Sequence, residues 1–230
     1  MKFIINKIYQ YFNSHHFSKK KKNLLVKLHT NFFSSNSTIK YFFGFKIYDE
    51  LHKRNYPHKY DLTTILLKIT LDKFLKNNKK NLEILEVGTG YYSLLSIYFK
   101  KKYNHNITAT DIEPNAIISA GLNCEKNNVS IELIVSDLFE NINDKKFDII
   151  FWNLPYYRDK NIYLKPFLNQ VSKYLNDNAK IFLGYNSTPL KPEEIIDITK
   201  DSPDIIYTKQ WDFLGTCIKY PLYLKNNLNN

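Results

Sequence analysis

The chain has 230 residues, 43% of them hydrophobic, and a formal net charge of +11 at neutral pH. This length suits one domain with an appendage, or two small domains, and is ample for a hydrophobic core. It contains no run of about 18 apolar residues, so we expect no transmembrane helix. Lys and Asn interrupt residues 1–12 too often for the apolar centre of a signal peptide. For these reasons we expect no membrane partner. The two cysteines, Cys124 and Cys217, lie far apart and lack metal-ligand spacing, so we expect a reducing, cytoplasmic location and no metal ion.

The net positive charge comes entirely from the first third of the chain. Residues 1–80 hold 17 of the 33 Lys and Arg but only four acids, and no acid precedes Asp49. Residues 81–230 hold 16 basic and 18 acidic residues and are therefore slightly acidic. A surface for phosphate groups or another anionic partner would explain this asymmetry. The lysine-rich composition of the whole chain is the alternative explanation, and both stay open.

The N-terminal third has irregular patterns. Residues 2–12 and, more weakly, residues 24–33 have helical periodicity. Apolar residues alternate with others over residues 39–47, which predicts an extended segment or a hairpin. Asp61 is placed to cap a helix that runs to about residue 77. The sequence therefore predicts two parts.

The first part, residues 1–60, is a small basic N-terminal extension suited to substrate recognition or to a lid. The second, residues 61–230, is the main domain. Within it, apolar runs predict seven strands, at residues 82–87, 106–110, 130–135, 147–152, 179–184, 205–211 and 217–224. Helical patterns fall between most of them, at residues 91–101, 114–127, 162–175 and 192–200. Such alternation is typical of a doubly wound, Rossmann-like α/β sheet, here closed by a terminal antiparallel hairpin at Gly215.

A glycine loop follows the first of these strands. The strand ends in Glu86-Val87 and runs directly into Gly88-Thr89-Gly90. Glycines let the backbone turn sharply and approach a ligand closely, and the next helix offers its N-terminus. An acid at Glu86 suits a cationic group better than a pyrophosphate.

Two further acids end the next two strands. Asp111 lies 21 residues after Gly90, near the usual distance for an acid that binds ribose hydroxyls. Asp137 follows the third strand, where a carboxylate is placed to accept a hydrogen bond from an adenine amino group. Because the carboxyl ends of parallel strands share one edge of a sheet, these acids predict a nucleotide site there.

The fourth strand ends in Asn153-Leu154-Pro155-Tyr156. Alone, these four residues would be an ordinary turn, because Asn and Pro are common turn residues and Pro cannot continue a central strand. After the three acids, they are instead candidates for the acceptor side of the same site. We expect the neighbouring Trp152 to be a packing residue.

In their order, these motifs resemble those of the class I S-adenosylmethionine-dependent methyltransferases. The best match is to the HemK-like protein-glutamine N5-methyltransferases, whose Asn-Pro-Pro-Tyr motif appears here with Leu154 at its first proline. The resemblance implies a methyltransferase sheet and S-adenosylmethionine as cofactor. It implies that the cofactor is bound by Glu86, Gly88, Thr89, Gly90, Asp111, Ile112, Asp137, Leu138 and Asn153.

The chain departs from the family pattern at several places. Tyr92 stands where the loop has its third glycine, and Asn176-Asp177-Asn178 replaces a Pro-Gly-Gly turn. The Asn-Leu-Pro-Tyr form is characteristic of rRNA adenine dimethyltransferases. Residues 1–60 do not clearly match the substrate-recognition domain of release-factor methyltransferases.

The resemblance also implies a mechanism for methyl transfer to a planar nitrogen. The Asn153 side-chain oxygen and the Leu154 carbonyl accept its two hydrogens, Pro155 fixes the backbone, and Tyr156 offers a flat face. Glu86 faces the methionyl amino group of the cofactor, directly or through water. The sulfonium methyl is already activated, so the enzyme mainly positions and polarises the acceptor.

Three functions follow from these observations. The first is N-methylation of a protein glutamine, with a translation-related protein as a possible partner. The second is N6-methylation of adenine in RNA or DNA, bound through the basic N-terminal third. The third is a non-catalytic module that keeps the fold and binds RNA or a protein.

Overall fold

The computed structural model describes residues 31–49, 59–77, 81–155 and 160–186, and short stretches beyond them, at 194–195, 197–198, 205–206, 209–213 and 216–224. The helix expected at residues 2–12 lies outside the described residues, as does most of the one expected at 192–200. None of the helices in the described part of the chain has the length and apolar character that a bilayer crossing requires.

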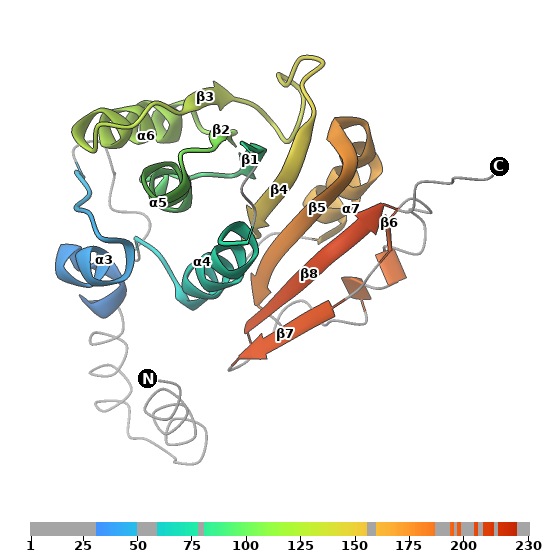
Figure 1. Ribbon diagram of the computed structural model, residues 1–230, viewed down its shortest axis with the longest axis horizontal. Helices are drawn as coiled ribbons and strands as arrows, with labels where there is room; N and C mark the ends of the chain where they lie inside the picture. The colour runs from blue at the N-terminus through green and yellow to red at the C-terminus, as the bar shows by residue number, and fades with distance from the viewer. Residues whose placement is uncertain are drawn as a thin grey trace, which may run out of the picture.

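The core of the molecule is a sheet in the order β3-β2-β1-β4-β5-β8-β6, with β7 also paired to β8 (Figure 1). Its first five strands run parallel and confirm the Rossmann-like α/β fold. They are β1 (Glu83–Val87), β2 (Asn106–Asp111), β3 (Glu132–Val135), β4 (Phe147–Asn153) and β5 (Leu175–Asn186).

The remaining strands are antiparallel and lie beyond β5. They are β6 (Ile205–Ile206), β7 (Lys209–Phe213) and β8 (Thr216–Leu224). The described sheet thus has eight strands, where the sequence predicts seven. β6 and β7 pair with β8 in one continuous register and together take the place of the single strand expected at 205–211. Residues 207–208, between them, lie outside the described part.

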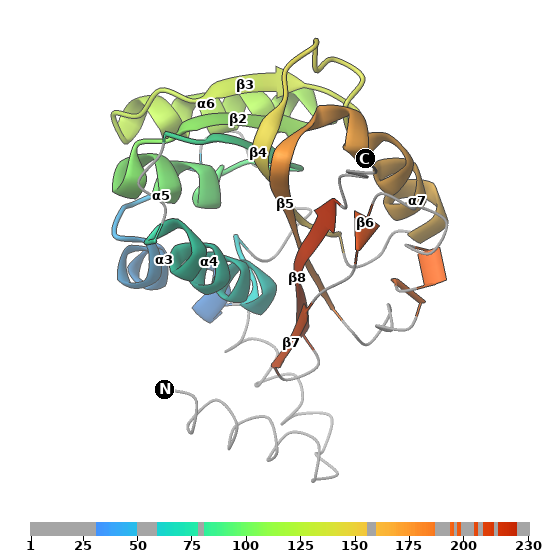
Figure 2. The ribbon, with the colours of Figure 1, turned by 45° about the vertical axis from the view of Figure 1, so that its right-hand side comes forward.

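Helices cover both faces of the parallel strands (Figures 1 and 2). On one face lie α4 (Leu62–Leu75), α5 (Leu94–Tyr103) and α6 (Pro114–Lys126); on the other lie α7 (Lys160–Val171) and a 3-10 turn (Ser172–Tyr174). The sheet has a hydrophobic core on each face. Successive side chains of a strand point to opposite faces and therefore pack into different cores. In β1, Ile84 packs with the α4 and α5 side chains, whereas Leu85 packs with those of α7.

Residues 36–43 form a helix, α3 (Asn36–Phe43), so the extended segment or hairpin expected at residues 39–47 is wrong for residues 39–43. The alternation is misleading because, within the helix, Ile39 and Phe43 are buried four residues apart, whereas Tyr41 between them is 77% exposed. Residues four apart lie on the same face of a helix, so this burial pattern is helical. Ser35 caps the helix by accepting a hydrogen bond from Ser37 N, and Gly44 ends it at φ +83°.

The segment after α3 belongs to the same core as the sheet. Phe43, Phe45 and Ile47 pack with side chains of α4 and α5. Asn123 of α6 exchanges hydrogen bonds with the backbone of Tyr48, donating to its carbonyl and accepting from its N–H. Residues 43–48 are thus part of the packed domain. The division of the chain at residue 60 into an N-terminal extension and a main domain stays a prediction.

Candidate active site

The carboxyl ends of the four central strands meet at one edge of the sheet. Val87 of β1 pairs with Thr110 on one side and with Trp152 on the other. Farther out, Asp111 pairs with Val135, and Asn153 pairs with Gly184. The loop glycines, the acids and Asn153 lie up to 67 residues apart in the sequence but are brought to the same edge of the sheet.

The loop after β1 requires its two glycines. Gly88 and Gly90 both have φ +66°, in the left-handed region that side chains rarely adopt. A Cβ on Gly88 would also lie 3.0 Å from Trp152 Nε1, whereas one on Gly90 would meet nothing within 4 Å. Thr89 N donates to Thr110 O (2.8 Å), which ties the loop to β2. The loop therefore leaves backbone and open space beside Gly90.

Glu86 lies beneath this loop and organises it. Its Oε2 atom accepts hydrogen bonds from Thr89 Oγ1 (2.8 Å), Ser96 N (3.3 Å) and Ser96 Oγ. Burial raises the pKa of Glu86 to about 7, and the negative charge of Asp111 adds to the rise, although the hydrogen bonds from Ser96 and Thr89 oppose it. The carboxyl group thus holds the loop onto the start of α5. A contact with the amino group of a ligand stays a prediction.

Asp111 fixes two backbone groups at the end of β2. Gly90 N donates to its Oδ2 (2.8 Å), and Glu113 N donates to its Oδ1 (3.0 Å). These two bonds hold the carboxylate in place at the carboxyl end of β2. This arrangement fits the ribose-binding role that the resemblance implies.

An apolar surface adjoins Asp111. Ile112 is 46% exposed, although it is a large hydrophobic residue. Leu138 is buried at φ +47°, an unusual conformation for a residue with a side chain. Asp137, which precedes it, is half-buried, and its carbonyl accepts from Glu140 N (3.0 Å). Exposed apolar surface beside carboxylates and strained backbone is typical of a ligand site.

Tyr92, the residue in place of the third loop glycine, is compatible with the loop. Its backbone is not among those with positive φ, so a side chain is allowed there. The ring is buried in the core, and its hydroxyl donates to Asp49 Oδ1 (2.8 Å). Asp49 also pairs with Lys59 (3.2 Å). Burial, and then the Asp49 carboxylate, raise the pKa of Tyr92 above its ordinary value. Tyr92 therefore anchors the segment after α3 to the loop.

Asn153, at the end of β4, carries the most unusual polar atom of this edge. Its Nδ2 donates to Thr64 Oγ1 of α4 (3.2 Å). Its Oδ1 is buried and has no hydrogen-bond partner among the described residues. A buried acceptor without a donor costs about 1–3 kcal/mol, so such atoms in folded proteins call for an explanation.

The residues after Asn153 are only partly described. Leu154 N donates to Gly184 O (2.8 Å), and the Leu154 side chain is buried against the α7 core. Among the described residues, none donates to the Leu154 carbonyl. Pro155 is exposed. Tyr156 lies outside the described residues, and its role stays a prediction.

Sequence reasoning missed two residues of this site, Thr64 and Gly184. A Cβ on Gly184 would lie 3.1 Å from Asn153 Oδ1 and 2.8 Å from Thr63 Cγ2, so glycine makes room for the amide under α4. Asp61 was expected as a helix cap, and it does cap α4, accepting from Thr64 N (2.6 Å). The contact of Thr64 with Asn153 joins residues 89 positions apart, and no local pattern reveals it.

Comparison with known proteins identifies the family. The profile of the methyltransferase small domain matches residues 57–201, more than half of the chain. The chain therefore belongs to this family of S-adenosylmethionine-dependent methyltransferases. The resemblance noted from the sequence motifs is thus confirmed.

Two relatives illustrate the range of acceptors. The chain is 36% identical to the release factor glutamine methyltransferase of Lactococcus lactis over 104 residues, which are 45% of this chain and 37% of the relative. It is 35% identical to the ribosomal protein L11 methyltransferase of Thermosipho melanesiensis over 122 residues, 53% of this chain and 43% of the relative. The chain spans half the length, or less, of the first curated relatives that it matches.

The fold also matches solved structures. A methyltransferase from Pyrococcus furiosus superimposes with a TM-score of 0.64 at 20% identity, covering 90% of this chain and 98% of that one. At this identity the match supports the fold alone.

The described residues fit the family's cofactor. The open space beside Gly90, the Asp111 carboxylate and the exposed Ile112 would suit the methionyl chain, the ribose and the adenine of S-adenosylmethionine, respectively. Among the described residues, no group of three or more His, Cys, Asp or Glu is placed to hold a metal ion.

Proposed function

We propose that this protein transfers a methyl group from S-adenosylmethionine to a planar nitrogen, and that the acceptor is a glutamine side chain of a protein. The single observation that carries the proposal is the buried Oδ1 atom of Asn153, which has no hydrogen-bond partner in the described part of the chain, at the same edge of the sheet as the glycine loop. An N–H of the acceptor would satisfy this oxygen, and the gain would be large because the atom has no other donor among the described residues.

Asn153 and Leu154 act on the acceptor. An amide nitrogen is a poor nucleophile because its lone pair is delocalised. When Asn153 Oδ1 and the Leu154 carbonyl accept its two hydrogens, the nitrogen is held in place and its lone pair is directed toward the methyl donor. The fixed backbone of Pro155 keeps these acceptors together, and Tyr156 packs against the flat amide.

The loop side binds the cofactor. S-adenosylmethionine supplies an activated methyl group, so the protein needs no strong base. Gly88, Thr89 and Gly90 admit the ligand close to the backbone, and Asp111 accepts the ribose hydroxyls. Ile112 and the turn formed by Asp137 and Leu138 would hold the adenine. Glu86 supports the loop and lies on the side of the cofactor's cationic amino group.

The named activities of the relatives support a protein acceptor. One methylates a glutamine of release factors and the other methylates ribosomal protein L11, according to their names. A translation-related protein is therefore the acceptor class we propose. Residues 1–60, which precede the family match almost entirely, would contribute to its recognition.

Adenine in RNA or DNA is the second candidate acceptor. The specific observation in its favour is the charge of residues 1–80, which hold 17 basic residues and four acids. An adenine amino group is also planar and would use the same acceptors. The third candidate, a non-catalytic module, loses its main support because Tyr92 anchors the loop rather than distorting it.

An acceptor screen tests the proposal. The full chain is incubated with radiolabelled S-adenosylmethionine and, separately, with ribosomes, release factors and total RNA. We expect label in a protein fraction, released as N5-methylglutamine on complete proteolysis. Label in RNA, with binding that weakens steeply as salt rises, would replace the glutamine acceptor by adenine. An absence of label in every fraction would contradict the activity itself.

A further inference from the structure

The hydroxyl of Thr64 sits between Asp61 and Asn153 and uses its full hydrogen-bonding capacity. Thr64 Oγ1 donates to Asp61 Oδ1 (2.7 Å). It accepts from Asp61 N (3.3 Å) and from Asn153 Nδ2 (3.2 Å). A hydroxyl has one proton and two lone pairs, so no capacity remains.

This arrangement fixes the orientation of the Asn153 amide. A carboxylate only accepts hydrogen bonds, so the proton between Thr64 and Asp61 belongs to Thr64. The lone pair that Thr64 turns toward Asn153 therefore requires a donor, and the NH₂ end of the amide is the donor. A reversed amide would bring its oxygen against that lone pair and leave its NH₂ group where Oδ1 now lies.

We propose that Thr64, held by Asp61, is a positioning residue that keeps Asn153 Oδ1 turned toward the acceptor nitrogen. The N-terminal cap of α4 thus has two tasks: it starts the helix, and it selects one of the two orientations of the Asn153 amide. This inference rests on the proposed role of Asn153 and names the residue that makes the role possible.

Gly184 supports the same conclusion from the opposite side. The Asn153 amide lies between α4 and β5, where a Cβ on Gly184 would approach its Oδ1 to 3.1 Å. Leu154 N also donates to Gly184 O (2.8 Å), which holds the end of β4 against β5. Glycine at 184 therefore leaves room beside the amide, and the hydrogen bond to Thr64 decides which end of the amide faces which neighbour.

The test compares two Thr→Val variants of α4. Thr64→Val removes the acceptor of Asn153 Nδ2, so the amide is expected to reverse and kcat for methyl transfer to fall by about tenfold or more, with unchanged affinity for S-adenosylmethionine. Thr70→Val is the matched control. Thr70 is buried on the same helix and its Oγ1 has no hydrogen-bond partner among the described residues, so kcat should stay at the wild-type value.

A second readout does not depend on turnover. The side-chain NH₂ protons of Asn153, identified in NMR spectra by their loss in Asn153→Ala, should exchange slowly with water in the wild type and in Thr70→Val. They should exchange faster in Thr64→Val. Thr64→Ser keeps the hydroxyl and should restore both slow exchange and most of kcat, which a merely structural role of the threonine methyl group would not do.

The outcomes separate this inference from the proposed function. If Asn153→Ala abolishes transfer while Thr64→Val keeps the wild-type kcat and slow exchange, the positioning role is wrong and the function stands. If Asn153→Ala transfers methyl groups at the wild-type rate, the proposed role of Asn153 is wrong, and the positioning role with it. If Thr64→Val fails to fold by circular dichroism, Thr64→Ser against Thr64→Ala decides the same question.

Discussion

The two ends of the parallel strands differ in how their carboxyl groups are paired. At the carboxyl ends, Glu86 is buried with a raised pKa, and Asn153 keeps an oxygen that has no donor among the described residues. At the amino ends a cluster of charged groups is paired, although the buried Nε2 atom of His105, just before β2, has no partner among the described residues. Lys145 Nζ contacts Glu132 Oε2 (2.8 Å), Thr108 Oγ1 (2.9 Å) and Glu83 Oε2 (3.5 Å).

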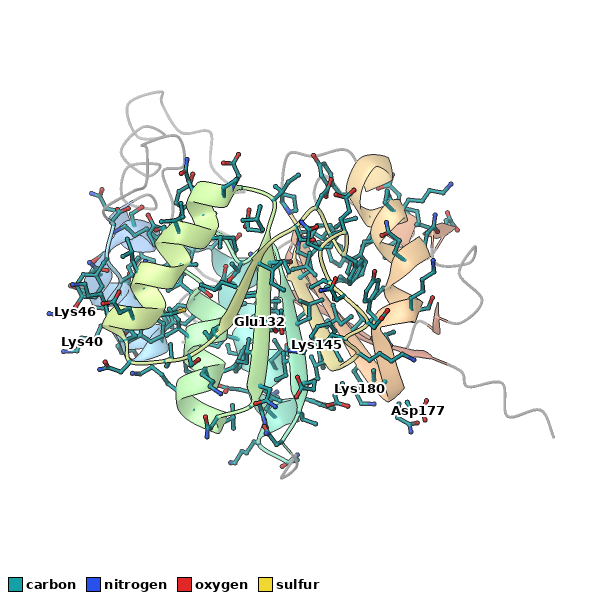
Figure 3. The ribbon with its side chains drawn as sticks, turned by 90° about the horizontal axis from the view of Figure 1, so that it is seen from above. Lys40, Lys46, Glu132, Lys145, Asp177 and Lys180 are labelled. Atoms are coloured by element: carbon teal, nitrogen blue, oxygen red, sulfur yellow. The ribbon has the colours of Figure 1, made fainter. Side chains whose placement is uncertain are left out.

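The matched cluster at the amino ends crosses four strands. Lys145 precedes β4, and its partners lie on β1, β2 and β3. Figure 3 shows Glu132 and Lys145 close together at this edge, with Lys180 and Asp177 of β5 farther along. Asp148 of β4 accepts from Glu83 N (2.8 Å). Every one of these interactions stabilises neighbouring strands without involving a ligand.

A ligand at the carboxyl edge would gain free energy by donating a hydrogen bond to Asn153 Oδ1, whereas the paired charges around Lys145 at the amino edge offer no such gain. Positive φ angles occur at both edges: at Gly88, Gly90, Ser93 and Leu138 beyond the carboxyl ends of β1 and β3, and at Asn104 and Asn128 before the amino ends of β2 and β3. At the amino edge they fall on asparagine, which adopts this region more readily than leucine does. Strain and unpaired polar atoms persist only where the surrounding structure holds them, and they are typical of functional sites. We therefore expect substitutions at the two edges to differ in size and, for the acids, in sign.

The largest expected effect is the pH dependence of stability at Glu86. Its folded pKa is raised from 4.5 to about 7, so the folded state holds a proton that the unfolded state has released. The stabilisation is fully present below pH 4.5 and is lost as the pH rises through about 7. Over that window the free energy of unfolding should fall by about 3 kcal/mol, because one pKa unit corresponds to about 1.4 kcal/mol.

Urea unfolding of the wild type and of Glu86→Gln measures this effect. Gln resembles the protonated acid, so the two proteins should be about equally stable near pH 5, and the variant should be more stable at pH 8. If the free energies of unfolding of the variant and the wild type differed by the same amount at both pH values, Glu86 would not be protonated in the folded state in the way proposed.

A smaller effect is expected from Gly88→Ala. The new Cβ combines φ +66° with a 3.0 Å approach to Trp152 Nε1, which should cost about 1–3 kcal/mol of stability. It should also weaken S-adenosylmethionine binding by about tenfold or more, as titration calorimetry would measure.

Gly121→Ala is the matched control for Gly88. Gly121 lies within α6, and its Cβ would be an ordinary 3.7 Å from Leu133 Cδ1. Alanine should therefore stabilise the protein by up to about 1 kcal/mol through helix propensity and leave binding unchanged. Equal losses of binding in both variants would mean that the loop has no special role.

The smallest effect is expected at the amino ends. The hydrogen bond from Lys145 lowers the pKa of Glu132, with Thr108 adding to it. This stabilisation is present above the unfolded pKa and is lost as the pH falls, the opposite sign to Glu86. Because both side chains are more than one third exposed, solvent screens the pair and Glu132→Gln should cost no more than about 1 kcal/mol at pH 7. Unfolding at pH 7 and pH 3 measures it; a loss that grew toward pH 3 would contradict the sign.

Much of this edge could be predicted because it depends on local sequence. Strand periodicity and turn residues place Gly88, Asp111 and Asn153 at strand ends, and parallel pairing then brings the ends together. The parallel sheet and the cap at Asp61 follow from the same kind of local signal. The helix at Asn36–Phe43 could not be predicted in this way. Its hydrophobic residues alternate with the period of a strand, whereas the residues that are buried in it, Ile39 and Phe43, are four apart.

The remaining features depend on distant contacts. Which side of α4 faces β4 is decided by packing, so the hydrogen bond from Asn153 to Thr64 is invisible in either segment alone. The same holds for Tyr92 and Asp49, 43 residues apart. The need for glycine at 184 arises from Thr63 and Asn153, on two other elements.

The most direct test is single-turnover methyl transfer by Asn153→Ala at saturating S-adenosylmethionine, with the acceptor fraction identified in the screen. The account predicts that the variant binds the cofactor like the wild type but transfers methyl groups slower by about 100-fold or more, since it lacks an acceptor needed in the transition state. A transfer rate equal to that of the wild type would contradict it.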